Sequence, residues 1–218
     1  MATSTEENYL KALFHLSQKT GEVSISELSK ALEVSKPTVN SMVKKLKTQG
    51  YLTYERYKPL VITSTGRKAA ALILRKHRLT EMYLVEKMGF GWEEVHEIAE
   101  QVEHIESPDF FDRMDELMDF PRVDPHGSPI PDKDGNIVQQ AHKKLSDCVA
   151  GDEIKLIALN NSSKEFLEFL DSRGISLELK MNIKSVEPFD NSMVVSYDQH
   201  TSETLSQKVC ERLLVLKV

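Results

Sequence analysis

The sequence predicts a mainly α chain with small β parts and a β-rich C-terminal third. Three observations support this prediction: helical periodicity over most of residues 5–120, a Pro- and Gly-rich stretch at 121–136, and strand-like runs after it. Of the 218 residues, 40% are hydrophobic and 28% are charged, which is typical of a globular chain and excludes a disordered one. We expect three domains, at residues 1–64, 65–136 and 137–218.

The N-terminal third has the pattern of a helix-turn-helix. Residues 5–19 place apolar side chains at spacings of three and four, which predicts an amphipathic helix capped by Thr5. A second helix follows over SISELSKALEV, and a third begins with Ser35 as its cap and Pro37 in its first turn. The run YLTYERYKPLVIT then predicts two short strands around a turn, which would complete a winged helix-turn-helix.

The distribution of charge indicates an anionic partner for this region. The net charge of the chain is −6, yet residues 35–78 carry +10 and residues 79–140 carry −12. A basic block within an acidic protein favours binding of nucleic acid. Short polar groups on the third helix would face base edges, and its lysines would neutralise phosphates. The candidate DNA-binding residues are Ser35, Lys36, Pro37, Thr38, Asn40, Ser41 and Lys44.

The middle third combines histidines and carboxylates at helical spacing. His77 and Glu81 lie four residues apart on a long helix expected to end near Met88. A second helix, expected over about 92–105, carries further histidines and glutamates on one side. Carboxylates packed together need a partner, and mixed nitrogen and oxygen ligands suit Mn²⁺, Fe²⁺, Co²⁺ or Zn²⁺ better than Ca²⁺ or Mg²⁺. The candidate ligands on this second helix are His96, Glu100, Glu103 and His104.

The rest of the chain carries no catalytic constellation. Another amphipathic, acidic helix is expected from Ser107-Pro108 to Pro121. Beyond residues 121–136, strand-like runs surround the short helix KEFLEFLDSRG, which predicts a small β-barrel-like module. The remaining histidines are expected to be surface or packed residues: His15, His126, His142 and His200.

Several features predict a cytoplasmic setting. No apolar run approaches the ~18 residues needed to span a bilayer, and the first eight residues are polar and acidic rather than typical of a signal peptide. Cys148 and Cys210 lie far apart in the sequence and form no metal-ligand pair, which favours a reduced compartment. We therefore expect no membrane partner.

Taken together, these motifs resemble the diphtheria-toxin-repressor family of metal-dependent transcriptional regulators, in its longer three-domain form. The most specific pieces are SKPTVNSMVKKL, RKHRLTEMYL, HEIAEQVEH and FPRVDPHGSPIP. The third domain looks like the SH3-like module of ferrous iron transport protein A, so the resemblance covers nearly the full length. It implies a homodimeric repressor of metal-homeostasis genes that binds a palindromic operator in double-stranded DNA, with no small organic substrate and no enzymatic activity.

The resemblance also implies where metal would bind. The positions of a primary site are matched by Asn8, Glu100, Glu103 and His104, and those of an ancillary site by His77, Glu81 and His96. Glu165 is the nearest candidate for help from the third domain. In the same way, the base-reading positions fall on Ser35, Pro37 and Ser41, with Thr38, Asn40 and Lys44 suited to phosphates.

Two positions bear on the choice of metal. Iron-type members of the family place Met and Cys where this chain has Asn8 and Glu100. Glu100 resembles the manganese-type pattern, because hard oxygen ligands favour Mn²⁺ over thiophilic ions. Manganese-type members usually have Asp at position 8, however, and a neutral amide oxygen is a weaker ligand. We expect Mn²⁺ to be preferred and Fe²⁺ to be possible.

Two other functions stay open at this stage. A di-metal carboxylate enzyme needs a Glu-x-x-His motif on each of two helices, and this chain offers only Glu93-x-x-His96. The other alternative is a metal-independent winged-helix DNA-binding protein whose acidic helices bind a protein partner.

Overall fold

The structure is a computed structural model that describes residues 3–56, 58–138, 141–160 and 162–218. The chain divides into two compact units, and the helices α4 and α5 each continue from one unit into the other. In the described residues, no helix combines the length and apolar character that crossing a membrane requires. The first unit comprises Met1–Thr80, Glu97–Arg122 and Ile130–Val138, and the second comprises Glu81–His96, Val123–Pro129 and Gln139–Val218.

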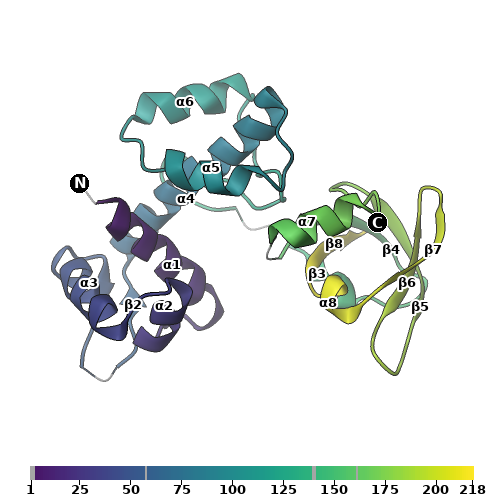
Figure 1. Cartoon of the computed structure of the whole chain (residues 1–218), viewed down its shortest axis with the longest axis horizontal. Helices are drawn as coiled ribbons and strands as arrows, with labels where there is room; N and C mark the ends of the chain where they lie inside the picture. The colour runs from purple at the N-terminus through teal and green to yellow at the C-terminus, as the bar shows by residue number, and fades with distance from the viewer. Residues whose placement is uncertain (1–2, 57, 139–140, 161) are drawn as a thin grey trace. The chain divides into compact units, whose positions relative to one another are not determined.

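Three helices at the N-terminal end of the first unit pack around a shared apolar core (Figure 1). They are α1 (Ser4–Thr20), α2 (Ile25–Ala31) and α3 (Lys36–Thr48). Leu10, Leu13 and Val43 are buried in this core, as the helical spacing predicted. The expected cap of α1 is wrong, because Thr3 caps the helix and Thr5 lies within it. Thr3 prevails because its side chain and that of Glu6 bind each other's backbone amides, which satisfies two N–H groups at once.

The third helix and the wing follow the sequence prediction closely. Ser35 caps α3 by accepting a hydrogen bond from the amide of Thr38, and Pro37 lies in the first turn. The wing strands are short, β1 (Leu52–Thr53) and β2 (Val61–Ile62), and pair antiparallel. The turn between them includes Tyr57, which lies outside the described residues.

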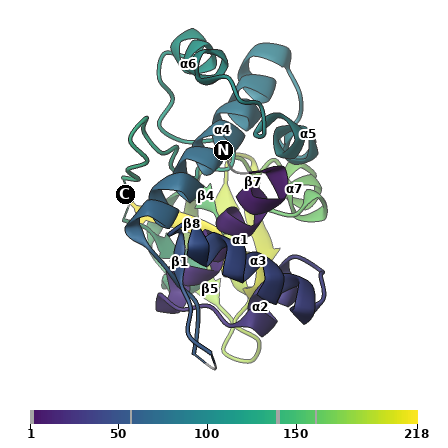
Figure 2. The ribbon, with the colours of Figure 1, turned by 90° about the vertical axis from the view of Figure 1, so that its left-hand side faces the viewer.

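A close backbone approach joins the wing to the long helix that follows it. A Cβ atom at Gly66 would lie 2.0 Å from the carbonyl oxygen of Tyr51, so only glycine fits there. This helix, α4 (Ser64–Met88), is continuous in Figure 2. The next two helices are shorter than expected: α5 (Val95–Val102) and α6 (Pro108–Leu117). Glu103 and His104 therefore lie in the turn after α5, where the amide of Glu103 still donates to the carbonyl of Ala99.

A buried ion pair fastens α4 to α6 within the first unit. The guanidinium of Arg75 donates to a carboxylate oxygen of Asp115 at 2.5 Å and to the carbonyl of Pro131 at 2.9 Å. Both side chains of the pair are almost fully buried. The acidic face predicted for α6 is therefore not wholly solvated, because Asp115 points inward to meet Arg75.

The second unit contains an antiparallel six-stranded sheet with the strand order β3-β8-β4-β5-β6-β7. The helix α7 (Lys164–Asp171) buries its apolar face in the core of this unit (Figure 1). The mainly helical fold class with a C-terminal β module is confirmed, while the three domain boundaries stay a prediction. The strands are β3 (Lys143–Lys144), β4 (Glu153–Leu159), β5 (Lys180–Val186), β6 (Met193–Tyr197), β7 (His200–Leu205) and β8 (Leu213–Lys217).

The sequence prediction missed several elements of this unit: β3, the 3-10 helix Leu145–Asp147, β7 and the short α8 (Gln207–Cys210). The strand β7 reads HTSETL, and of its residues only Leu205 is buried. A mostly polar edge strand forms because its backbone pairs with β6, for example Thr204 with Val194. The pattern of polar and apolar side chains in the sequence does not reveal this backbone pairing.

A buried carboxylate links α1 to the C-terminal end of α3. Glu6 is 1% exposed, and its oxygens accept from Lys45 at 2.8 Å, Gln49 at 2.9 Å and the amide of Thr3 at 2.6 Å. The hydrogen bond from Lys45, followed by that from the Thr3 amide, lowers the pKa of Glu6 from 4.5 to about 2. The carboxylate therefore stabilises the fold while it is ionised.

We expect the substitution Glu6→Gln to lower the free energy of unfolding by about 1.5–3 kcal/mol at pH 7, because hydrogen bonds to a charged group are lost. The stabilisation by Glu6 is fully present above its ordinary pKa of 4.5 and is lost as the pH falls to about 2. Urea unfolding of both proteins should show their difference closing across that interval. Glu22→Gln, at an exposed position after α1, is the matched control, and a difference that does not change with pH would contradict the prediction.

Candidate metal centre and DNA-binding surface

The Glu103 carboxylate is the centre of a polar cluster in the first unit. It is 0% exposed, and Nδ1 of His77 lies 2.6 Å from its Oε2. Nζ of Lys11 lies 2.7 Å from Oε1 and 2.8 Å from Oε2. Burial raises the pKa of Glu103, but the hydrogen bond with His77 and the charge of Lys11 outweigh it and bring the pKa below its ordinary value. Glu103 is therefore a buried anion that requires positive charge beside it.

Asn8 on α1 and Glu100 on α5 are two further residues of the first unit with oxygen atoms that could coordinate a metal ion. The same Lys11 ammonium that contacts Glu103 lies 2.5 Å from Oε1 of Glu100. Oδ1 of Asn8 is buried and has no hydrogen-bond partner among the described residues. A buried amide oxygen without a donor costs free energy, and a cation would satisfy it. The predicted ligand that departs most from the family pattern is thus an oxygen available for coordination.

His104 is oriented by a residue that the sequence analysis did not single out. Its Nδ1 lies 2.6 Å from Oε2 of Glu7 on α1, and its Nε2 lies 3.8 Å from Oε1 of Glu103. Since a carboxylate accepts, Nδ1 carries a proton, and Nε2 is the ring nitrogen that faces Glu103. A carboxylate behind a ligating histidine is a common device for fixing its tautomer. No local signal predicts this role, because Glu7 and His104 lie far apart in the sequence.

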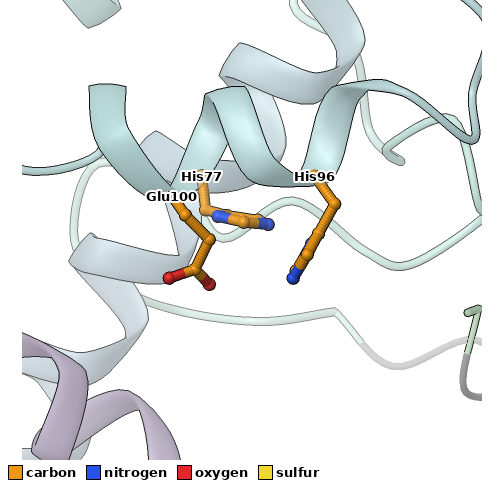
Figure 3. A group of neighbouring side chains, drawn as sticks. All are labelled: His77, His96 and Glu100. Carbon is orange, nitrogen blue, oxygen red and sulfur yellow. The ribbon is translucent and has the colours of Figure 1, made fainter.

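His77 adds an imidazole from α4. Its Nδ1 lies 2.6 Å from Oε2 of Glu103. A ring nitrogen of His77 lies within 4.8 Å of a carboxylate oxygen of Glu100. Figure 3 shows these two side chains together with His96, which precedes Glu100 by one turn of α5.

These residues fit a divalent cation. The cluster joins two carboxylates and imidazole nitrogens around a place that now holds an ammonium group. The buried Asn8 oxygen on α1 is a further oxygen donor in the same unit. Hard oxygens with imidazole and without thiolate suit Mn²⁺ or Fe²⁺. The residues of the predicted primary site that the first unit contains are Asn8, Glu100, Glu103 and His104, with His77 beside them.

A second cluster lies wholly within the second unit. Glu81, Asp124 and His126 are all buried, and one ligand atom of each lies within 4.8 Å of the others. The predicted pair of Glu81 and His96 also forms here, with His96 Nδ1 3.2 Å from Glu81 Oε1. Glu165, the suggested extra ligand, is instead exposed in the first turn of α7. Its own backbone amide and then Ser163 lower its pKa, which keeps it ionised at the surface.

The geometry of His126 resembles that of a ligating histidine. Its Nε2 donates to the carbonyl oxygen of Trp92 at 2.9 Å, and the two rings stack. Its Nδ1 lies 3.8 Å from Oε2 of Glu81 and 4.0 Å from Oδ1 of Asp124. The sequence analysis expected His126 to be a surface or packed residue. The spacing of Asp124 and His126 in the sequence did not indicate a shared site, because a turn and not a helix brings the two residues together.

The turn that carries Asp124 and His126 is held by hydrogen bonds to the Asp124 carboxylate and by a close approach to β4. One carboxylate oxygen of Asp124 accepts from the amides of His126 and Ser128 at 2.8 and 2.9 Å. A Cβ atom at Gly127, whose φ is +84°, would lie 2.2 Å from the carbonyl oxygen of Ile157 on β4. The strand thus fixes the turn that carries two of the three candidate ligands.

The predicted DNA-binding residues lie on α3 and at its cap. All are exposed except Asn40, which is half-buried and donates to the carbonyl of Lys36. The hydroxyls of Ser35 and Thr38 lie 2.8 Å apart at the cap, so both are partly committed to helix capping. Lys44 is exposed, whereas its neighbour Lys45 pairs with Glu6.

Comparisons with known proteins agree with this arrangement. Residues 1–60 match the model of the iron-dependent repressor N-terminal DNA-binding domain, and residues 63–132 match that of the iron-dependent repressor metal-binding and dimerisation domain. The iron-dependent repressor IdeR of Mycobacterium leprae is 35% identical over 127 residues, 58% of this chain and 55% of its own. The match thus spans little more than half of that relative.

Two further relatives extend the comparison. The HTH-type transcriptional regulator MntR of Shouchella clausii is 33% identical over 120 residues, covering 55% of this chain and 83% of its own. A solved manganese-dependent transcriptional repressor in complex with manganese has a TM-score of 0.87 at 30% identity, covering 98% of this chain and 100% of that chain.

All three relatives are regulators of transcription, which favours a regulator over the enzyme alternative. The two family models together cover the DNA-binding, metal-binding and dimerisation parts that the sequence analysis expected. The chain belongs to the iron-dependent repressor family, the diphtheria-toxin-repressor family of metal-dependent transcriptional regulators.

Proposed function

We propose that this protein is a homodimeric, metal-activated repressor of metal-homeostasis genes, with Mn²⁺ preferred and Fe²⁺ possible. The observation that carries the proposal is the cluster around Glu103, in which Lys11 and Glu7 of α1 contact the candidate ligands Glu103 and His104. The segment of α1 that supplies Asn8 belongs to the matched DNA-binding domain, and the segment that supplies Glu100, Glu103 and His104 belongs to the matched dimerisation domain.

The coupling to DNA runs through α1. Glu6 holds the C-terminal end of α3 by its contacts with Lys45 and Gln49, while Glu7 and Lys11 on the same helix contact the metal cluster. When bound, a divalent cation supplies the positive charge that Glu100 and Glu103 need, and it can be coordinated by the Asn8 oxygen. A fixed position of α1 then fixes the orientation of the recognition helix.

The operator is expected to be palindromic double-stranded DNA. In a two-fold dimer the two α3 helices would enter successive major grooves, roughly 34 Å apart. Within each half-site, Ser35, Pro37 and Ser41 would face base edges and Lys44 would contact phosphate. We expect the protein to act in the cytoplasm, where such an operator would lie.

The choice of Mn²⁺ or Fe²⁺ rests on the donor atoms. Asn8, Glu100 and Glu103 offer oxygen, and the histidines offer imidazole nitrogen. The carboxylate at position 100 takes the place of a softer thiolate, which disfavours thiophilic ions. We further propose a second cation position at Glu81, Asp124 and His126, because its donors are buried and Nδ1 of its histidine faces the two carboxylates.

Metal is expected to increase operator affinity about 5- to 150-fold, which corresponds to a coupling of 1–3 kcal/mol. The operator can be selected from random duplexes by the protein in excess Mn²⁺ and then titrated by fluorescence anisotropy at fixed salt, with and without a chelator. Glu103→Gln should weaken Mn²⁺ binding, followed by electron paramagnetic resonance, by more than about tenfold and abolish the increase.

The matched control is Glu97→Gln, at an exposed position on α5, and this variant should retain the metal response. Operator binding that is equally tight in chelator would instead support the metal-independent alternative. Metal-dependent turnover of O₂ or of an ester by the purified protein would support the enzyme alternative.

Lys44→Ala is expected to weaken binding to all duplexes by a similar factor, because a phosphate contact carries no sequence information. The slope of log K against log salt should become shallower by roughly 0.9 for each subunit. Lys184→Ala, at an exposed position on β5, should leave the slope unchanged. A loss confined to the selected operator, with the same slope, would mean that Lys44 reads a base instead.

The second cation position can be followed through Trp92, the single tryptophan of the chain, because its ring stacks on that of His126. Mn²⁺ is paramagnetic and should quench its fluorescence when it binds there. We expect Glu81→Gln to remove this quenching and to lower the Mn²⁺ stoichiometry from two to one per subunit, whereas Glu103→Gln should retain the quenching. Quenching that persists in Glu81→Gln would contradict the second position.

A further inference from the structure

The ammonium group of Lys11 lies where a metal cation bound by Glu100 and Glu103 would be expected. Its ammonium nitrogen is 2.5 Å from Oε1 of Glu100 and 2.7 and 2.8 Å from the two oxygens of Glu103. The side chains of Lys11 and Glu103 are 13% and 0% exposed, so their contact is an interior one, whereas Glu100, at 36%, lies at the edge of the cluster. One lysine thus satisfies two carboxylates that the proposed function assigns to the metal.

The charges allow one occupant at a time. A divalent cation bound by Glu100 and Glu103 would need the same carboxylate oxygens that Lys11 now contacts. An ammonium group a few ångströms from a dication is also strongly repelled, since little water separates charges in a buried cluster. Conversely, without any cation the buried Glu103 carboxylate would be uncompensated, which is strongly destabilising.

We propose that Lys11 is a built-in counter-cation that competes with the metal for Glu100 and Glu103 and so sets the metal concentration at which the protein responds. The inference rests on the proposed function, because it assigns the same two carboxylates to the metal. In the metal-free protein Lys11 holds α1 against the turn after α5, and its positive charge offsets part of the negative charge of Glu100 and Glu103. Loading the site requires these ion pairs to break and the ammonium to move away.

The competition determines affinity and not only stability. Metal binding to the wild type pays for breaking the contacts of Lys11, whereas in a variant without the ammonium the two carboxylates have no such contact to break. Removing Lys11 should therefore make the metal-free protein less stable and the metal tighter. Few structural lysines would have this opposite pair of effects, since loss of a merely supporting residue weakens both folding and ligand binding.

The experiment compares wild type, Lys11→Leu and Lys11→Arg. The Mn²⁺ dissociation constant is measured by electron paramagnetic resonance, and the melting temperature is measured with and without saturating Mn²⁺. We expect Lys11→Leu to bind Mn²⁺ at least about tenfold more tightly, to melt roughly 5 °C lower without metal, and to regain most of that loss with it. Lys11→Arg keeps the charge and should bind Mn²⁺ no more tightly than the wild type.

The matched control is Lys30→Leu, at an exposed position on α2, which should change neither quantity appreciably. A second readout uses the wild type alone, in case Lys11→Leu does not fold. Nitrogen-15 NMR should show a slowly exchanging lysine ammonium signal without metal, which disappears on saturation with diamagnetic Cd²⁺.

Mn²⁺ binding by Lys11→Leu that is unchanged or weaker, or an ammonium signal that persists in Cd²⁺, overturns the inference while the proposed function stands. If the wild type itself binds no Mn²⁺ at Glu100 and Glu103, both fail. Tighter binding by Lys11→Arg as well would also overturn it, because charge would then not be the cause.

Discussion

The charge of the buried Glu103 carboxylate constrains the whole of the first unit. A carboxylate with no solvent exposure is tolerable only with positive charge or hydrogen-bond donors around it. Here His77 comes from α4 and Lys11 from α1, so a single anion fastens two helices to the turn after α5. Any change in what neutralises Glu103 must therefore be felt by the helix that carries Asn8.

That helix, α1, links the two activities because its polar residues face different neighbours. Glu6 faces the C-terminal end of α3, while Glu7 and Lys11 contact the candidate metal cluster. The contacts are short and mostly buried, so the helix cannot shift on one side without disturbing the other. A short rigid element with two polar faces is a simple means of coupling metal binding to the position of a recognition helix.

Both candidate metal sites also have their histidines prepared in the same way. Glu7 accepts from Nδ1 of His104, and the carbonyl oxygen of Trp92 accepts from Nε2 of His126. In each case the other ring nitrogen faces a carboxylate. Rings held in a fixed orientation reduce the reorganisation that metal binding requires. The two sites lie in different units and use different acceptors for the same purpose.

The sequence by itself determined the fold class, the helix-turn-helix with its Ser35 cap, and the histidines and carboxylates that converge around Glu103, because helical periodicity, capping and charge are local properties of the chain. It also indicated that buried carboxylates need a cation, but it assigned that role to metal alone. Only the tertiary structure placed Lys11 on Glu100 and Glu103, Glu7 behind His104, and Asp124 and His126 beside Glu81. Those contacts join residues far apart in the chain or residues brought together by a turn, so no spacing in the sequence records them.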